Sequence, residues 1–171
     1  MAFLNLMKSF TGRAGKHDGT AASIDQIEKA MADGDTQRAM SLVSEARAGG
    51  RMERRTEVRL DLVEGTILLK QGKPREACEH LREVWESGFD DLAVEAGMAY
   101  LQCLTECQSH QEALRVCGRL VELLASGSVR HGEVQVTAAG LLLKTGETGQ
   151  AEEKMRAAIR SLESAGDGPE W

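Results

Sequence analysis

Apolar side chains recur every three or four positions through most of this 171-residue chain, the spacing that places them on one face of an α-helix. Each run closes near a glycine or a polar residue that can cap a helix, and the next run opens within a few positions. The pattern predicts eight helices joined by short turns. The expected helices cover 23–33, 35–48, 54–71, 74–85, 91–104, 110–124, 134–144 and 150–162.

Several helix starts have recognisable capping sequences. The segments Ser23–Gln26 and Ser109–Glu112 both have the form of a capping box, in which the serine and the acidic or amide side chain satisfy free backbone N–H groups. Asp35 is expected to cap the second helix. Pro74 suits the first turn of the fourth helix, because proline has no N–H to leave unpaired there.

One small-residue pattern repeats along the chain at nearly constant spacing. An alanine follows a glycine by five positions three times, and a fourth copy keeps the alanine but has glutamine in place of glycine: Gly34/Ala39, Gly72/Ala77, Gly146/Ala151 and Gln108/Ala113. The alanines are 38, 36 and 38 residues apart. Such a period indicates stacked helical hairpins that bury their apolar faces against neighbours. We expect repeats over 20–50, 53–88, 90–126 and 129–165, after an arm and linker (1–19) and before a disordered tail (166–171).

The second repeat resembles the tetratricopeptide repeat (TPR) family. Gly65, Gly72 and Ala77, followed by the large Leu81, stand at the spacing of that family's small and large positions. The first and fourth repeats supply the paired small residues of the second helix as Ala39/Ala46 and Ala151/Ala158. The resemblance covers about residues 20–165 and implies an all-α solenoid, a right-handed superhelix of about four helix-turn-helix repeats.

The same resemblance implies where a partner binds. In the family, the first helix of each repeat lines a concave groove on either side of its small central residue. Carried onto this chain, the groove positions are Arg59, Leu62, Val63, Thr66, Leu69, Lys70, Met98, Ala99, Gln102, Thr105, Val136, Thr137, Gly140 and Leu143. These residues suit an apolar peptide or an amphipathic helix, with Arg59 and Lys70 available to an acidic flank. The alternative is that several of them only pack one helix against the next.

Composition narrows the classes of partner. A net charge of −6 and only six aromatic residues argue against nucleic acid, which needs a cationic surface or stacking platforms. No apolar run is long enough to span a membrane, and the short apolar N-terminus has no basic segment before it, so we expect a cytoplasmic protein without a cleaved signal.

Cysteines and histidines offer the most tempting chemistry. Cys103, Cys107 and His110 could contribute to a metal site, with Cys117 nearby across the hairpin. The alternative is that the four cysteines, all expected inside helices, are small core residues. We expect the latter, with ordinary solvated histidines, no metal, no cofactor and no enzymatic activity, because no nucleophile or acid/base motif is present.

The N-terminal arm has its own pattern. Phe3, Leu6, Met7 and Phe10 stand at i, i+3, i+4 and i+7, so a helical arm would be amphipathic. It could cap an exposed apolar end of the solenoid, or dock a partner protein or a second copy. Membrane contact is the weakest option, because ten residues with one lysine bind lipid poorly.

A non-catalytic protein-interaction module, an adaptor or chaperone-like scaffold, is the function that these features favour. In size and layout the chain also resembles the secretion-apparatus chaperones of bacteria. The alternative is a structural subunit that self-associates or builds into a larger bacterial complex, such as a secretion or motility machine.

Overall fold

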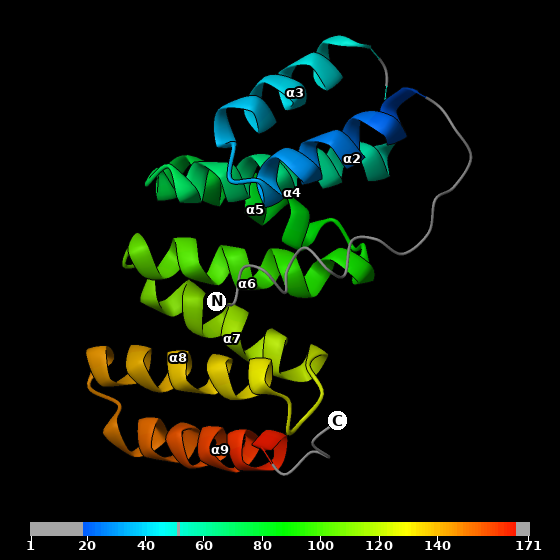
Figure 1. Ribbon diagram of the computed structural model, residues 1–171. Helices are drawn as coiled ribbons and strands as arrows, with labels where there is room; N and C mark the ends of the chain where they lie inside the picture. The colour runs from blue at the N-terminus through cyan, green and yellow to red at the C-terminus, as the bar shows by residue number, and fades with distance from the viewer. Residues whose placement is uncertain (1–18, 51, 167–171) are drawn as a thin grey trace. The chain divides into compact units, whose positions relative to one another are not determined.

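The computed structural model describes residues 19–50 and 52–166, and within these ranges every regular element is an α-helix (Figure 1). The helices are α2 (Gly19–Ala32), α3 (Thr36–Ala48), α4 (Arg54–Lys70), α5 (Pro74–Glu86), α6 (Asp90–Glu106), α7 (His110–Leu123), α8 (Val129–Thr145) and α9 (Thr148–Gly166). The all-α repeat architecture expected from the sequence is confirmed. None of these helices combines the length and the apolar character that crossing a membrane requires.

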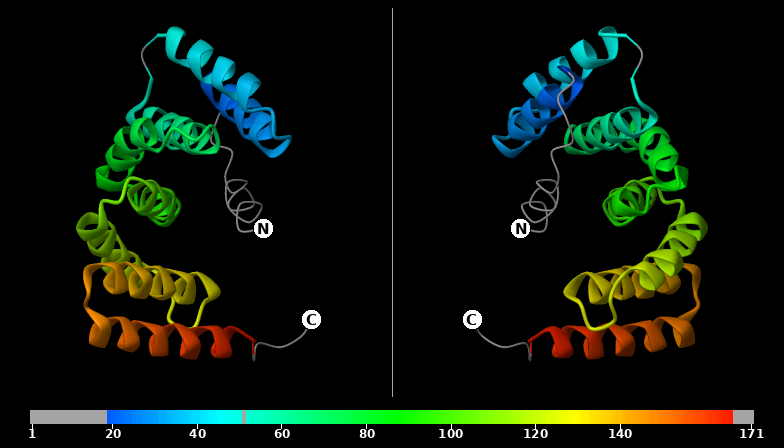
Figure 2. Two further views of the ribbon diagram at one scale, coloured as in Figure 1. Left: turned by 90° about the vertical axis from the view of Figure 1, so that its left-hand side faces the viewer. Right: turned by 90° about the vertical axis from the view of Figure 1, so that its right-hand side faces the viewer.

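Consecutive helices pair as hairpins. The pairs α8/α9 and α4/α5 make the most extensive contacts, and α2/α3 and α7/α8 follow equally. Figures 1 and 2 show α8 and α9 running antiparallel side by side. The described residues fall into two compact units, an N-terminal unit ending at Ala99 and a C-terminal unit beginning at Tyr100.

The turn inside each hairpin uses one backbone conformation. Gly34, Gly72 and Gly146 have φ of 79°, 73° and 85°, in the left-handed region that a residue without a Cβ enters freely. Gln108 occupies the equivalent place in the third repeat and has the same conformation, with φ of 59°. The repeated glycine is therefore a requirement of the turn, and the glutamine meets that requirement at an energetic cost.

Small residues allow the paired helices to approach closely. Ala39, Ala77 and Ala113 are fully buried. A Cβ added to Gly65 would lie 2.6 Å from Cγ of Leu81, so α4 and α5 can meet at this distance only because Gly65 has no side chain.

Each unit has its own apolar core. In the N-terminal unit, residues of α2, α3 and α4 form one cluster: Ile24, Ile27, Ala30, Met31, Ala39, Val43, Leu60, Val63 and Ile67. In the C-terminal unit, Ala139, Leu142 and Ala151 bury against each other with Leu114 beside them.

Two predicted helix starts are wrong. Ser23 lies inside α2, which begins at Gly19, because the Thr-Ala-Ala segment before it extends the helix rather than ending it. The seventh helix, α8, begins at Val129, five residues before the expected Val134, because Ser128 accepts a hydrogen bond from the backbone N–H of His131 (3.2 Å) and caps it there.

Of the two remaining cap predictions, the one at Asp35 is confirmed and the one at Ser109 is wrong. Asp35 caps α3 as expected, accepting from the backbone N–H of Arg38 at 2.9 Å. Ser109 precedes α7 but makes no capping bond with its side chain. Glu112, the other half of that expected box, instead accepts a hydrogen bond from the hydroxyl of Tyr100 (2.7 Å), so it ties α6 to α7.

Candidate functional site

One face of α8 presents the clearest open apolar surface among the groove positions. Val136, Gly140 and Leu143 stand at i, i+4 and i+7, and Leu143 leaves 55% of its surface exposed. Apart from its two chain neighbours and the local helix backbone, no described atom lies within 4 Å of where a Cβ of Gly140 would stand, so the glycine leaves space between the two aliphatic side chains. A partner side chain can enter this space.

The other groove positions differ in how much surface they offer. Leu62, Val63 and Thr66 on α4 are buried, and the Thr66 hydroxyl donates to the carbonyl of Leu62 at 2.7 Å. These three pack within the N-terminal unit, as the packing alternative expects. Of the rest, Lys70 and Gln102 are exposed, and Leu69, Met98, Ala99, Thr105 and Thr137 are half-buried.

Arg59, the cation expected to meet an acidic flank, already has an anionic neighbour. Its guanidinium donates to a carboxylate oxygen of Glu28 on α2 at 2.6 Å. Burial raises the pKa of Glu28 above its usual range, and Arg59 offsets only part of that effect. The ion pair links α2 to α4, so Arg59 has a structural contact whatever it binds. The arm residues Phe3, Leu6, Met7 and Phe10 lie outside the described residues.

A second open apolar stripe runs along α9. Met155, Ile159 and Leu162 are exposed, with Ile159 at 49%, although their spacing predicted a buried face. The equivalents of the first two in the second repeat, Leu81 and Trp85, are buried to 0% and 7% exposure. The apolar pattern is thus the same in both repeats, but on α9 Met155 and Ile159 stay exposed, while the side chain of Leu162 lies beside Gly132 of α8.

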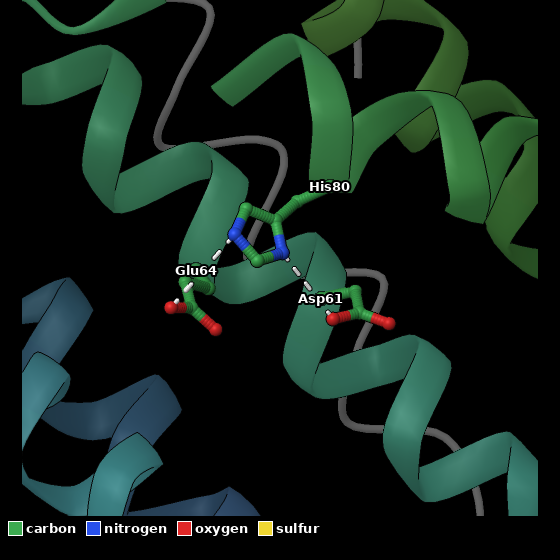
Figure 3. A group of neighbouring side chains, drawn as sticks. All are labelled: Asp61, Glu64 and His80. Carbon is green, nitrogen blue, oxygen red and sulfur yellow. Dashed lines mark hydrogen bonds and ion pairs between the residues drawn. The ribbon is translucent and has the colours of Figure 1, made fainter. Parts of the chain in front are cut away.

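Four side chains from three helices form an ion cluster in the N-terminal unit. Arg47 of α3 donates to Asp61 (2.6 Å) and Glu64 (2.9 Å) of α4. His80 of α5 lies between the two carboxylates, with Nδ1 at 3.4 Å from Asp61 and Nε2 at 3.9 Å from Glu64 (Figure 3). Burial lowers the pKa of Arg47, but its bonds to Asp61 and its attraction to both carboxylates outweigh that and raise it overall.

The same cluster has the right donors for a metal. Ligand atoms of Asp61, Glu64 and His80 all lie within 4.8 Å of one another. However, each imidazole nitrogen faces a different carboxylate, and Arg47 already supplies a cation to both. The arrangement fits a cross-link between helices better than a coordination site.

A pocket of about 240 Å³ lies within the C-terminal unit, between α7, α8 and α9. Apolar groups make most of its inner wall: Leu114, Cys117, Val121, Ala138 and Leu142. Gln135 of α8 also lines it and is only 5% exposed, yet its Oε1 has no hydrogen-bond partner among the described residues. An acceptor buried without a donor costs stability.

The thiol of Cys117, which lines this pocket, has a shifted pKa. Burial raises the pKa of Cys117 to about 12, and the positive charge of Lys154 opposes this shift only in part. Burial therefore keeps this thiol in its neutral form.

Sequence reasoning missed both polar features. Asp61 and Gln135 occupy the same repeat position, sixteen residues before the buried alanines Ala77 and Ala151. Both are buried on the first helix of their repeats. A polar residue at a buried repeat position was the available signal.

The expectations for cysteines and histidines need three corrections, at Cys107, His131 and His80. Cys107 lies just after the end of α6, not inside a helix, while Cys103 and Cys117 are buried as expected of core residues. His131 is not solvated: it is buried and its Nδ1 lies 2.8 Å from the hydroxyl of Ser161 on α9. His80 is half-buried in the ion cluster. The group Cys103, Cys107, His110 and Cys117 does not converge as metal ligands in the described part of the chain.

Comparison with known proteins identifies the fold. No protein-family model matches the sequence, and no curated protein is significantly similar to it. Among solved structures, the chain is similar to YrrB, described as a TPR protein with an unusual peptide-binding site (TM-score 0.70, 21% identity, 85% of this chain and 70% of that one). It is also similar to MamA from RS-1 (0.72, 14%, 90% and 80%) and to MamA from MSR-1 (0.68, 15%, 95% and 86%). The chain has a TPR-like fold.

Proposed function

We propose that this chain is a non-catalytic protein-interaction module that binds a peptide or an amphipathic helix of a partner protein on the open face of α8. The observation that carries the proposal is the exposed pair Val136 and Leu143 with Gly140 between them. A stripe of this kind matches the i, i+4, i+7 anchors of an apolar helix or peptide. The likeness to a TPR protein described as peptide-binding supports the same class of function.

The role of an adaptor or chaperone-like scaffold follows from that surface. A surface that makes aliphatic contacts and few directed hydrogen bonds selects partners by apolar shape, which suits a module that holds another chain without reacting with it.

Site-specific photo-crosslinking in the native host tests this proposal. Benzoylphenylalanine at position 143 should capture a discrete protein partner, because Leu143 belongs to the stripe and its side chain is exposed to solvent. The matched control is position 144, where Lys144 is also exposed but lies about 100° around the helix. Capture should also disappear with Val136→Asp, with the helical circular dichroism unchanged. Equal capture at 143 and 144, or capture that survives Val136→Asp, would refute the α8 face.

The α9 stripe favours a second candidate, a subunit that self-associates. In the second repeat the equivalent apolar positions are covered, so a helix from another copy could cover Met155 and Ile159 in the same way.

A further inference from the structure

The apolar stripe of α9 faces solvent where the equivalent positions of the second repeat are covered. Met155, Ile159 and Leu162 leave 38%, 49% and 42% of their surfaces exposed. In the second repeat, the positions of Met155 and Ile159 hold Leu81 and Trp85, which are buried. A repeat that ends a stack normally carries a polar outer face. The stripe is therefore a surface suited to packing against a further helix.

The distribution of exposed apolar side chains indicates which surface can match this stripe. Among the described residues, the exposed large hydrophobic side chains all belong to the C-terminal unit: Leu123, Val129, Val136, Leu143, Met155, Ile159 and Leu162. The described part of the N-terminal unit thus offers no apolar surface that could pair with α9, which argues against copies stacked end to end through α2 and α3. The α9 stripe of a second copy matches in length and character. A patch that pairs with itself closes into a twofold dimer.

Charged residues beside the stripe are placed to pair across a twofold axis. Arg156 and Glu163 are both exposed, and because they are seven residues apart they lie on the same side of α9. If two α9 helices run antiparallel with Met155 of each opposite Leu162 of the other, Arg156 lies within two residues of Glu163 of the second copy. That offset is about 3 Å along the helix axis, which both side chains can span. The twofold axis repeats the contact, so the dimer gains two pairs of opposite charge.

The reverse orientation lacks this match. Two α9 helices packed parallel and in register would place Arg156 opposite Arg156 and Glu163 opposite Glu163. Like charges that face each other across an interface disfavour association. The charge pattern therefore favours the antiparallel arrangement.

We propose that α9 packs antiparallel against α9 of a second copy, with Met155, Ile159 and Leu162 as the shared apolar contact and Arg156 paired with Glu163 of the second copy. The proposal rests on the self-association given above as the second candidate function, and it specifies the partner surface and its orientation. The α8 stripe takes no part in this contact.

Charge reversal followed by mixing tests the orientation. Arg156→Glu and Glu163→Arg are made in the full chain, and the Kd of the dimer is measured by sedimentation velocity. Each variant alone places like charges at both pairs and should raise this Kd about ten-fold or more. A mixture of labelled Arg156→Glu with unlabelled Glu163→Arg places opposite charges at both pairs. The heterodimer should therefore form with a Kd close to that of the wild type.

The mixture also separates contacts between copies from contacts within one helix. Arg156 forms an exposed pair with Glu152 inside α9, and mixing cannot restore that pair. Glu153→Arg is the matched control, because Glu153 is exposed but lies six residues from Ile159, about 120° around the helix. It should leave the Kd of the dimer unchanged. Circular dichroism of every variant checks that the helical content is retained.

Four results would overturn the proposal. A monomeric wild type would exclude self-association as well, whereas an oligomer whose folded charge variants do not restore each other would exclude only this arrangement. Growth beyond a dimer with concentration would indicate an open contact between different surfaces. Loss of the dimer in a Phe3→Asp, Phe10→Asp double variant would assign the stripe to the N-terminal arm. The crosslink at position 143 reports on the α8 face alone, so its failure and the failure of the α9 contact are separate results.

Discussion

Gln108 holds a backbone conformation that the other three repeats assign to glycine. A residue with a side chain costs about 1–2 kcal/mol in the left-handed region. Glycine avoids this strain, but it loses more backbone entropy on folding, so only part of the cost is recovered. We therefore expect Gln108→Gly to raise the free energy of unfolding by about 0.5–1 kcal/mol in urea titrations. Gln102→Gly, inside α6, is the control and should lower it by about 1 kcal/mol. A loss of stability in Gln108→Gly would contradict the assigned turn.

At Gly65 we expect that replacing the glycine lowers the stability of the protein. Gly65→Ala places a methyl group against the fully buried Leu81, so the free energy of unfolding should fall by about 1–2 kcal/mol although alanine favours helix. In Gly118→Ala the new Cβ meets open space, and the same substitution should add about 0.5–1 kcal/mol. Thermal melts of the two variants should thus shift in opposite directions.

At this scale, what the sequence predicted were local requirements. The glycine of the turn and the alanines of the hairpin meet steric requirements set within a few residues. Their regular spacing therefore makes these requirements visible in the sequence. Partnerships between helices are different. His131 meets Ser161, and Asp61 meets Arg47, across separations that no local pattern encodes.

The ion cluster acts between helices. Arg47→Met removes the cation that lies between Asp61 and Glu64, and Asp61 is mostly shielded from water. After a discount for the partial exposure of Arg47, we expect a loss of about 1–2 kcal/mol in the free energy of unfolding. Arg156→Met breaks an exposed pair with Glu152 inside α9 and should change it by less than about 0.5 kcal/mol. Equal effects in calorimetry would mean that the cluster contributes only as a surface pair does.

Element boundaries show where capping sequences mislead. Both boxes satisfy the sequence rule, yet Ser23 lies inside α2, and Ser109 stands at the start of α7 without a side-chain capping bond. At Ser109, Glu112 has a better partner in Tyr100 of the preceding helix, which is visible only after the hairpin has closed. Asp35, by contrast, needs nothing beyond the backbone three residues away, and it caps as expected.

For the whole molecule, the α9 stripe predicts self-association. If Met155 and Ile159 pack against another copy, the wild type should form an oligomer by light scattering, and Ile159→Asp should shift it to the monomer without loss of helical content. Leu123→Asp, at an exposed apolar residue of α7, is the control and should leave the mass unchanged. A monomeric wild type across the concentration range would exclude this candidate.

The architecture was readable from the sequence because a period of 36–38 residues reflects how every hairpin packs on its neighbours. The binding surface was only partly readable. On α8 the positions implied by the resemblance are open, but on α4 Leu62, Val63 and Thr66 are buried. The apolar character of a repeat position does not tell whether a neighbouring helix or a partner covers it.

The labelling rate of the buried thiol of Cys117 can report local opening of the protein. A thiol protected by burial and a pKa of about 12 reacts with alkylating reagents only when the surrounding helices separate, whereas Cys78 and Cys107 remain partly accessible in the folded state. The labelling rate at Cys117 therefore measures how often α7, α8 and α9 come apart under native conditions. A bound ligand that holds these helices together would lower the labelling rate of Cys117, so this rate can reveal a ligand before its identity is known.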